Sequence, residues 1–263
     1  MNFKIFTLLV LGLNQISFGD MTGKEIMEKQ KNLHKTNSEF EVEMMILQNK
    51  DGSKETRKLK RYMREQEKDV YRSLLVFMDP SDIKGTALLN WQHKEARDDQ
   101  WLFMPALKKM DRIAEGGKKN YFMGTDFTYE DLQSEDTNDY TYTVLKKEKC
   151  LETKDCSVVE AIPATDAKKK ESGYSKRVMW ITADNFVTVK TDFYNKQGTL
   201  QKTQTNMDFI NVSGTIWRAQ KGVMDNVKIN HKTYIAIADR KINEKIEDKV
   251  FTDRFILNGE HTQ

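Results

Sequence analysis

Alternating apolar and polar side chains are the dominant pattern of the chain, and they predict many short strands. Over residues 40–46 the apolar side chains of Phe40, Val42, Met44 and Ile46 alternate with Glu41, Glu43 and Met45. This period of two is typical of a strand with one buried face. Tight turns such as 49–52, which contains Asp-Gly, separate the runs. Further strands are predicted at 55–65, 69–78, 85–92, 100–104, 158–162, 175–181, 186–194, 200–210, 215–224 and 227–238.

Helical spacing appears mainly near the two ends of this pattern. Residues 22–34 predict a helix that begins with a capping box at Thr22 and Glu25. Asn243 is the expected cap of a C-terminal helix, and a short helical insert is expected at 129–132. The apolar stripe of the C-terminal helix consists of Ile246, Val250, Phe251 and Phe255. Serial strands joined by tight turns favour one curved antiparallel sheet, whose concave face would bury both helices.

The N-terminus has the three parts of an export signal in order. Lys4 is the positive residue, 5–13 is the apolar stretch, and Ser17 and Gly19 are the small residues before the cleavage site. The apolar stretch has about half of the roughly 20 residues that a spanning helix needs. We therefore expect cleavage after Gly19 and a soluble periplasmic protein with a single domain, 20–263. A buried N-terminal helix is the alternative.

Charge and cysteine spacing narrow the classes of function. The 43 Lys and Arg residues and the 40 Asp and Glu residues are interspersed, without the basic stripe that a nucleic-acid groove requires. In an oxidising compartment Cys150 and Cys156 would pair and staple a hairpin. Free thiols and a redox-active pair are the alternatives, although redox pairs usually have two intervening residues.

Motifs for catalysis are missing from the sequence. It has no G-x-S-x-G elbow, no phosphate-binding loop and no dinucleotide fingerprint. No metal or cofactor is expected, because the histidines lack metal-ligand spacing; they are His34, His93, His231 and His261. The acidic run 130–139 lacks the central glycine of a calcium loop, so a solvated face is expected there.

Three blocks between residues 80 and 132 are the most distinctive part of the chain. They read PSDIKGTALL at 80–89, WLFMPALKK at 101–109 and FMGTDFTYEDL at 122–132. In this order they resemble the outer-membrane lipoprotein-sorting proteins, relatives of the periplasmic carrier LolA. The resemblance implies a LolA/LolB-like fold that is mainly β with flanking helices. In that fold an incomplete, half-open antiparallel β-barrel, covered by helices, encloses a hydrophobic cavity for acyl chains.

The resemblance is to a distant branch of that family. No residue here aligns with the arginine through which the lipoprotein carrier controls its lid. Without that arginine, free lipid is as good a cargo as a lipoprotein. The resemblance also implies an association with exporters of the resistance-nodulation-division (RND) type.

Candidate cavity residues are apolar side chains on the predicted strands and motif blocks. Methionine and aromatic side chains suit varied apolar ligands, and burial of an acyl chain contributes about 0.8 kcal/mol per CH₂. An ordinary packed core is the alternative. The predicted lipid-binding residues are Met44, Ile46, Leu75, Phe77, Leu88, Trp91, Trp101, Phe103, Phe122, Trp180 and Trp217.

A basic loop surrounds Gly116 and Gly117. Its side chains are candidates for contact with anionic head groups or an acidic partner. A solvated hairpin tip is the alternative, and 122–127 is expected to be a mobile flap beside it, because Gly124 allows unusual backbone angles. The basic residues are Lys108, Lys109, Arg112, Lys118 and Lys119.

These observations leave three hypotheses. The first is a non-enzymatic carrier that passes lipid or lipoprotein acyl chains from an inner-membrane transporter, of RND or ABC type, towards an outer-membrane acceptor. The second is an accessory subunit that docks on an exporter and carries no cargo. The third is a periplasmic hydrolase that uses Asp126 or Glu130.

Overall fold

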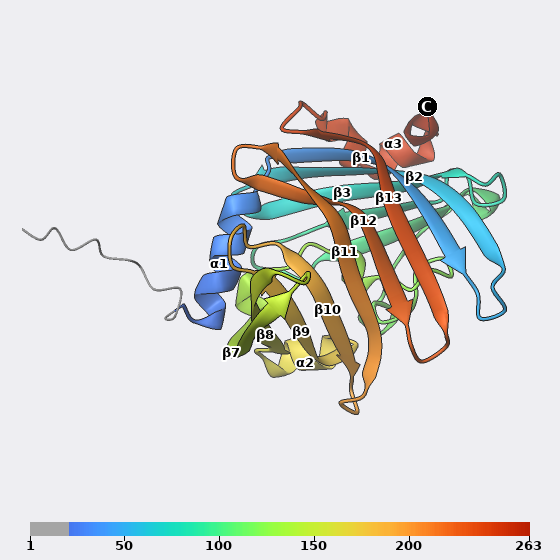
Figure 1. Ribbon diagram of the computed structural model, residues 1–263. Helices are drawn as coiled ribbons and strands as arrows, with labels where there is room; N and C mark the ends of the chain where they lie inside the picture. Colours follow the sequence, from blue (N-terminus) through green and yellow to red (C-terminus); the bar gives the residue numbers. More distant parts are fainter. Residues whose placement is uncertain (1–20) are drawn as a thin grey trace, which may run out of the picture.

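The computed structural model describes residues 21–263, so the expected signal sequence lies outside the described residues. Within that range thirteen strands form one antiparallel sheet (Figure 1). The strands are β1 (Ser38–Gln48), β2 (Lys54–Glu67), β3 (Val70–Asp79), β4 (Ala87–Trp91), β5 (Asp99–Met104), β6 (Lys109–Arg112), β7 (Tyr140–Cys150), β8 (Lys154–Pro163), β9 (Tyr174–Thr182), β10 (Thr188–Asn195), β11 (Leu200–Ser213), β12 (Ile216–Asn226) and β13 (His231–Ile242).

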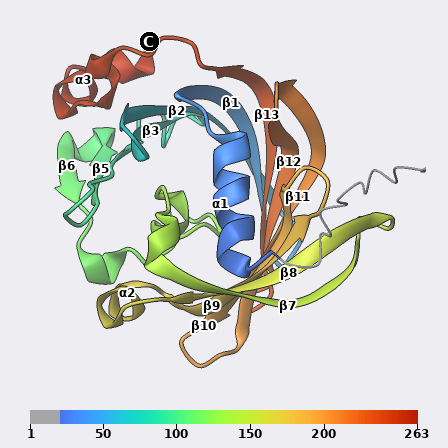
Figure 2. The same cartoon turned by 90° about the vertical axis from the view of Figure 1, so that its left-hand side faces the viewer.

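Strand order shows how the sheet curls. The order is β6-β5-β4-β3-β2-β1-β13-β12-β11-β10-β9-β8-β7, so the first and last strands of the chain pair in the middle. The sheet curves round towards itself, but β6 and β7 remain its two free edges (Figure 2). The predicted half-open antiparallel barrel is therefore confirmed.

Helix α1 (Gly23–His34) lies inside the curve of the sheet (Figure 2). The predicted capping box is present: the Thr22 side chain accepts from the Glu25 amide, and the Glu25 carboxylate accepts from the Thr22 amide. Ile26 and Met27 bury the helix stripe against the inner side of β7, β8 and β9. Placement of this helix on the concave face is confirmed.

The C-terminal helix differs from its prediction. Asn243 has a left-handed backbone (φ 57°), and its side chain accepts a hydrogen bond from the Asn37 amide instead of capping a helix. Of the predicted helix, residues 248–251 form a 3-10 helix and only α3 (Asp253–Leu257) is α-helical; α3 lies outside the curve of the sheet (Figure 2). Phe251 and Ile256 pack there against Leu74 and Val76 of β3, while the inner face of β3 packs against the segment that follows β6.

The segment that joins β6 to β7 passes through the interior of the barrel. Tyr121 and Thr128 form a bridge, and the hairpin 121–128 between them, which we call the plug, is mostly buried. Phe122 stacks on Phe77 of β3 with ring centroids 5.5 Å apart. The predicted mobile flap is therefore wrong, since Phe122 and Phe127 are buried in clusters beneath the sheet.

The remaining helical segments are short. The insert predicted at 129–132 is present as a 3-10 helix. The short segments are η1 (Pro105–Leu107), η2 (Glu115–Gly117), η3 (Glu130–Leu132), η4 (Thr137–Asp139), α2 (Asp166–Glu171), η5 (Asp248–Phe251) and η6 (Glu260–Thr262).

Candidate functional site

A cavity of about 610 Å³ lies between α1 and the concave face of the sheet. We call it the main cavity. Its walls come from α1, β1, β2, the plug and β10 to β13, so it depends on the closure of β1 against β13. Its apolar lining residues are Met27, Met63, Phe127, Val187, Phe209, Trp217, Val223, Ile235 and Ile237.

Five charged side chains on one wall of the main cavity, together with Glu39 next to them, form what we call the ion-pair belt. Three glutamates occupy alternate positions of β1 and therefore point to the same face. Each meets an arginine from a neighbouring part of the sheet. The pairs are Glu43 with Arg61 (Oε1 to Nε, 2.7 Å), Glu41 with Arg240 (Oε1 to Nε, 2.7 Å) and Glu39 with Arg218 (Oε2 to Nη2, 2.9 Å).

The belt has one unsatisfied position. Glu43 is 1% exposed, and its Oε2 has no hydrogen-bond partner among the described residues. Burial disfavours the charge of Arg61, but the carboxylates of Glu43 and Glu41 outweigh this effect and raise the pKa of Arg61. The cavity thus combines an apolar wall with a paired, charged one.

His34 ties the last turn of α1 to the sheet beside the main cavity. Its Nε2 lies 2.8 Å from the Asn185 carbonyl oxygen, and its Nδ1 accepts from the Trp217 amide at 3.2 Å. Burial lowers the pKa of His34, which favours the neutral ring with the proton on Nε2. The helix therefore depends on a neutral histidine at this point.

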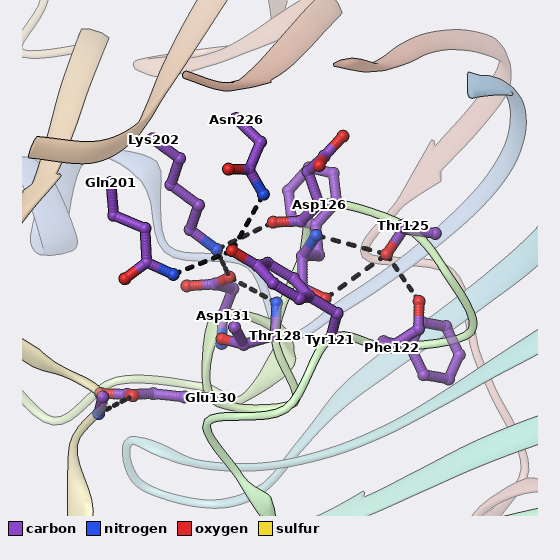
Figure 3. A network of polar contacts seen from close by, with 12 residues as sticks. Tyr121, Phe122, Thr125, Asp126, Thr128, Glu130, Asp131, Gln201, Lys202 and Asn226 are labelled. Atoms are coloured by element: carbon purple, nitrogen blue, oxygen red, sulfur yellow. Dashed lines mark hydrogen bonds and ion pairs between the residues drawn. The ribbon is translucent and has the colours of Figure 1, made fainter. Parts of the chain in front are cut away.

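A buried polar network holds the plug against the sheet (Figure 3). Lys202 of β11 forms an ion pair with Asp131 and donates to the Asp126 carbonyl at 2.8 Å. The Asp126 carboxylate accepts from the Thr233 hydroxyl at 2.7 Å and lies 2.7 Å from Nδ1 of His231. Each of these contacts joins the plug, or η3 directly after it, to β11 or β13. The network therefore holds this part of the chain against the sheet.

A second cavity of about 360 Å³ adjoins the main cavity. Ser134, Glu135 and Gln204 line both, so the two spaces meet there. The second cavity lies among the loop after β4, η3, α2 and β9, and charged side chains dominate its walls. Glu130, one of the two residues of the hydrolase hypothesis, lies there, whereas Asp126 is engaged in the plug network.

Most predicted lipid-binding residues lie away from the main cavity. Trp217 alone of the eleven lines it. Four others, on the concave side, are buried in a closed cluster with Met45 and Leu47; they are Leu75, Phe77, Leu88 and Phe122. Trp180 packs instead with the Cys150–Cys156 region, and its indole donates to Glu148 at 2.6 Å.

The remaining predicted lipid-binding residues lie on the outer face of the sheet. Met44 and Ile46 point away from Met45 and Leu47, which are their neighbours along β1, so they lie on the outer face. There Met44 shares its face with Tyr62 of β2, which packs against the C-terminal segment. The same C-terminal cluster, on the outer face, contains Trp91, Trp101 and Phe103.

The basic loop divides into exposed and buried parts. Leu107 is 61% exposed beside Lys108 and Lys109, at the edge formed by β6. Lys118 is 3% exposed and pairs with Glu171 at 2.6 Å, so for this residue the solvated-tip alternative is wrong. Lys109 pairs with Asp111 at 2.5 Å, and Arg112 pairs with Asp99.

Three further features bear on chemistry. A disulfide joins Cys150 to Cys156 across the β7–β8 hairpin. Between residues 21 and 263 no group of three or more His, Cys, Asp or Glu side chains is placed to hold a metal ion. No helix in the described part of the chain is long and apolar enough to cross a membrane.

Comparison with known proteins gives consistent matches over most of the chain. A family model described as "Uncharacterized protein" matches residues 69–258. The crystal structure of a putative outer membrane lipoprotein-sorting protein domain from Vibrio parahaemolyticus is 33% identical, with a TM-score of 0.83, and the match covers 89% of this chain and 98% of that one. No curated protein sequence matches.

Two other solved structures have similar folds. A DUF1329 family protein from Desulfovibrio piger is 26% identical, with a TM-score of 0.83, over 89% of this chain and 97% of that one. A LolA superfamily protein from Nitrosomonas europaea is 22% identical, with a TM-score of 0.71, over 90% of this chain and all of that one.

Proposed function

This chain belongs to the outer-membrane lipoprotein-sorting protein family, and from that premise we propose that it is a periplasmic carrier of acyl chains. It takes lipid or lipoprotein from an inner-membrane transporter, of RND or ABC type, and delivers it towards an outer-membrane acceptor. The signal sequence expected at 1–19 directs export, and the disulfide between Cys150 and Cys156 supports an oxidising compartment.

The observation that carries this proposal is the main cavity. Its volume of about 610 Å³ falls within the range of small-molecule sites, and most such sites are lined by apolar side chains. Met27 and Met63 supply flexible walls on two sides, which suits acyl chains of varied length and unsaturation. Each methylene buried there contributes about 0.8 kcal/mol.

The ion-pair belt fits a carrier that must also release its cargo. Its three glutamates and three arginines compensate one another, so the belt itself carries no net charge. Contact with these polar groups contributes less binding free energy to a hydrocarbon chain than contact with an apolar surface does. Affinity is therefore limited, and no chemical step is needed to discharge the carrier.

Native mass spectrometry of the mature protein, purified from the bacterial periplasm, tests the proposal. We expect a mass increment that disappears on denaturation, with a lipid or acylated peptide in the solvent extract. A clean apo mass, repeated after incubation with membrane lipids, would overturn the carrier function.

Docking on an exporter is the second candidate, and one observation favours it. Leu107, Lys108 and Lys109 form an exposed apolar and basic turn beside the edge strand β6. An acidic exporter surface or anionic head groups would match that turn. Co-purification from detergent extract should be lost for Leu107→Glu and kept for Leu145→Glu, a change at another exposed leucine. Equal recovery of the two variants would exclude this turn as the docking point.

A further inference from the structure

We propose that the second cavity receives the polar head group of the cargo and that this head group carries a primary ammonium. The inference rests on the proposed carrier function and narrows its cargo to lipids with an amine-bearing head. It is carried by the continuity of the two cavities, by the charge of the second one, and by buried polar atoms that have no partner there.

Continuity sets where a head group would lie. Ser134, Glu135 and Gln204 form the shared boundary of the two cavities. An acyl chain held against α1 in the main cavity would reach this boundary with its polar end. The second cavity, beyond the boundary, is the polar space that adjoins the apolar one.

Charge selects a cation. Seven aspartate and glutamate side chains line the second cavity, against four lysines and arginines. Three of the seven, Asp98, Glu130 and Asp136, form no ion pair among the described residues, and of these Asp98 and Glu130 are partly buried. Burial raises the pKa of both carboxyls, which is the cost of holding charges there that Arg177, near Glu130, and Lys118 and Lys168, near Asp98, compensate only in part. A positive group of the ligand would remove that cost.

Hydrogen-bond geometry selects an N–H donor. Glu130 Oε2 accepts from the Gly173 amide at 2.7 Å, whereas its Oε1 is buried without a hydrogen-bond partner. Figure 3 shows the Glu130 side chain turned away from the Lys202 network that engages Asp131. An ammonium with three N–H groups can donate to Glu130 and to a second acceptor, which a quaternary amine cannot do.

Arg177 completes a dipolar site. Its guanidinium pairs with Glu135 at the boundary and stacks on the Tyr140 ring at 4.5 Å, but its buried Nε donates to no described atom. A phosphate next to the ammonium would accept from this nitrogen. The chemistry that satisfies both ends is that of an ethanolamine phosphate head group. An acylated protein terminus carries an amide nitrogen in place of the ammonium, so free phospholipid is the better match.

Binding of two short-chain lipids tests the inference. Dihexanoyl phosphatidylethanolamine and dihexanoyl phosphatidylglycerol have identical acyl chains, so titration of the mature protein with each, below the micellar concentration, isolates the head group. We expect roughly tenfold tighter binding of the ethanolamine lipid, as one charge-assisted hydrogen bond warrants. Glu130→Gln should abolish the preference, and Asp166→Asn, at an exposed carboxylate outside the cavity, should retain it.

The outcomes separate this inference from the carrier function. If both lipids bind the wild-type protein equally, or if Glu130→Gln keeps the preference, the head-group site is wrong and the carrier function stands. If neither lipid binds, both proposals are overturned. Asp98→Asn provides a second variant in case Glu130→Gln fails to fold, and it should also reduce the preference for ethanolamine.

Discussion

Lys202 of β11 and Asp131 of η3, directly after the plug, form an ion pair in which both side chains are buried, Lys202 completely. The same ammonium donates to the Asp126 carbonyl, so one cation holds two points of a segment more than 70 residues away in sequence. A charge buried in the protein interior is strongly destabilising when its partner is removed. The pair therefore fixes the plug inside the barrel.

Removal of the cation should destabilise the whole molecule. We expect Lys202→Met to lower the free energy of unfolding by about 3–5 kcal/mol, because Asp131 would be left buried and unpaired. Urea denaturation followed by tryptophan fluorescence measures this. Lys202→Met combined with Asp131→Asn should recover part of the loss. Lys221→Met, at an exposed ion pair, should leave the midpoint unchanged, and an equal loss in that control would contradict the argument.

Acidification should weaken the attachment of α1 through His34. Burial lowers the pKa of this side chain, so the unfolded chain binds the proton more readily than the folded one. Stability from His34 is therefore complete above the ordinary pKa of about 6.5 and declines as the pH falls below it. Unfolding free energies of wild type and His34→Gln at pH 7.5 and 5.5 should show a flatter pH dependence in the variant. Parallel slopes would exclude His34 as the source.

Gly23 should not tolerate alanine, although alanine is the better helix former. A Cβ at Gly23 would lie 2.8 Å from the backbone carbon of Tyr142 in β7, which cannot move easily. We expect Gly23→Ala to lower the free energy of unfolding by roughly 1–3 kcal/mol, as overpacking does. Helix propensity alone would predict the opposite sign. Thermal unfolding measures the change, with Glu28→Ala on the exposed face of α1 as a mild control. A higher melting temperature for Gly23→Ala would show that α1 is not held this close.

Filling of the main cavity should reduce cargo binding without loss of the fold. Gly222 of β12 lines the cavity, and a Cβ there would meet only Asn206 and Thr205, at 3.4 Å and 3.7 Å. The larger side chain of Gly222→Leu would occupy space that the acyl chain needs. We expect roughly tenfold weaker lipid binding by fluorescence titration, since insertion into filled space costs about 1–3 kcal/mol. Val227→Leu, at an exposed turn, is the matched control, and equal affinity of the two variants would place the lipid elsewhere.

Local signals were enough to predict much of the fold. The capping box at Thr22 and Glu25 is formed by residues three apart, so it is visible in the sequence. Strand β7 was not predicted, because it is mostly exposed and rich in threonine and lysine. The predicted helix start at Asn243 was wrong, because the Asn243 side chain accepts a hydrogen bond from the Asn37 amide, more than 200 residues earlier in the chain.

The cavity was harder to predict for a related reason. Residues 44–47 are all apolar, so alternation cannot decide which pair faces inward, and an error of one residue turns each side chain to the other face. Glu39, Glu41 and Glu43 have the appearance of a solvated face in the sequence. Two of the arginines that compensate them, Arg218 and Arg240, lie nearly 200 residues later, so the inward direction of β1 is apparent only in the assembled sheet.

The separation of β6 and β7 has a mechanical consequence. The circumference of a fully closed barrel is set by the hydrogen bonds between its strands. A wider cargo could enter only if all the hydrogen bonds between two neighbouring strands were broken. Here the two edges are joined only through the chain that passes inside, so the wall can flex along one seam while every strand pair stays intact. The barrel can thus widen or narrow around cargo of different cross-section with little strain in the sheet.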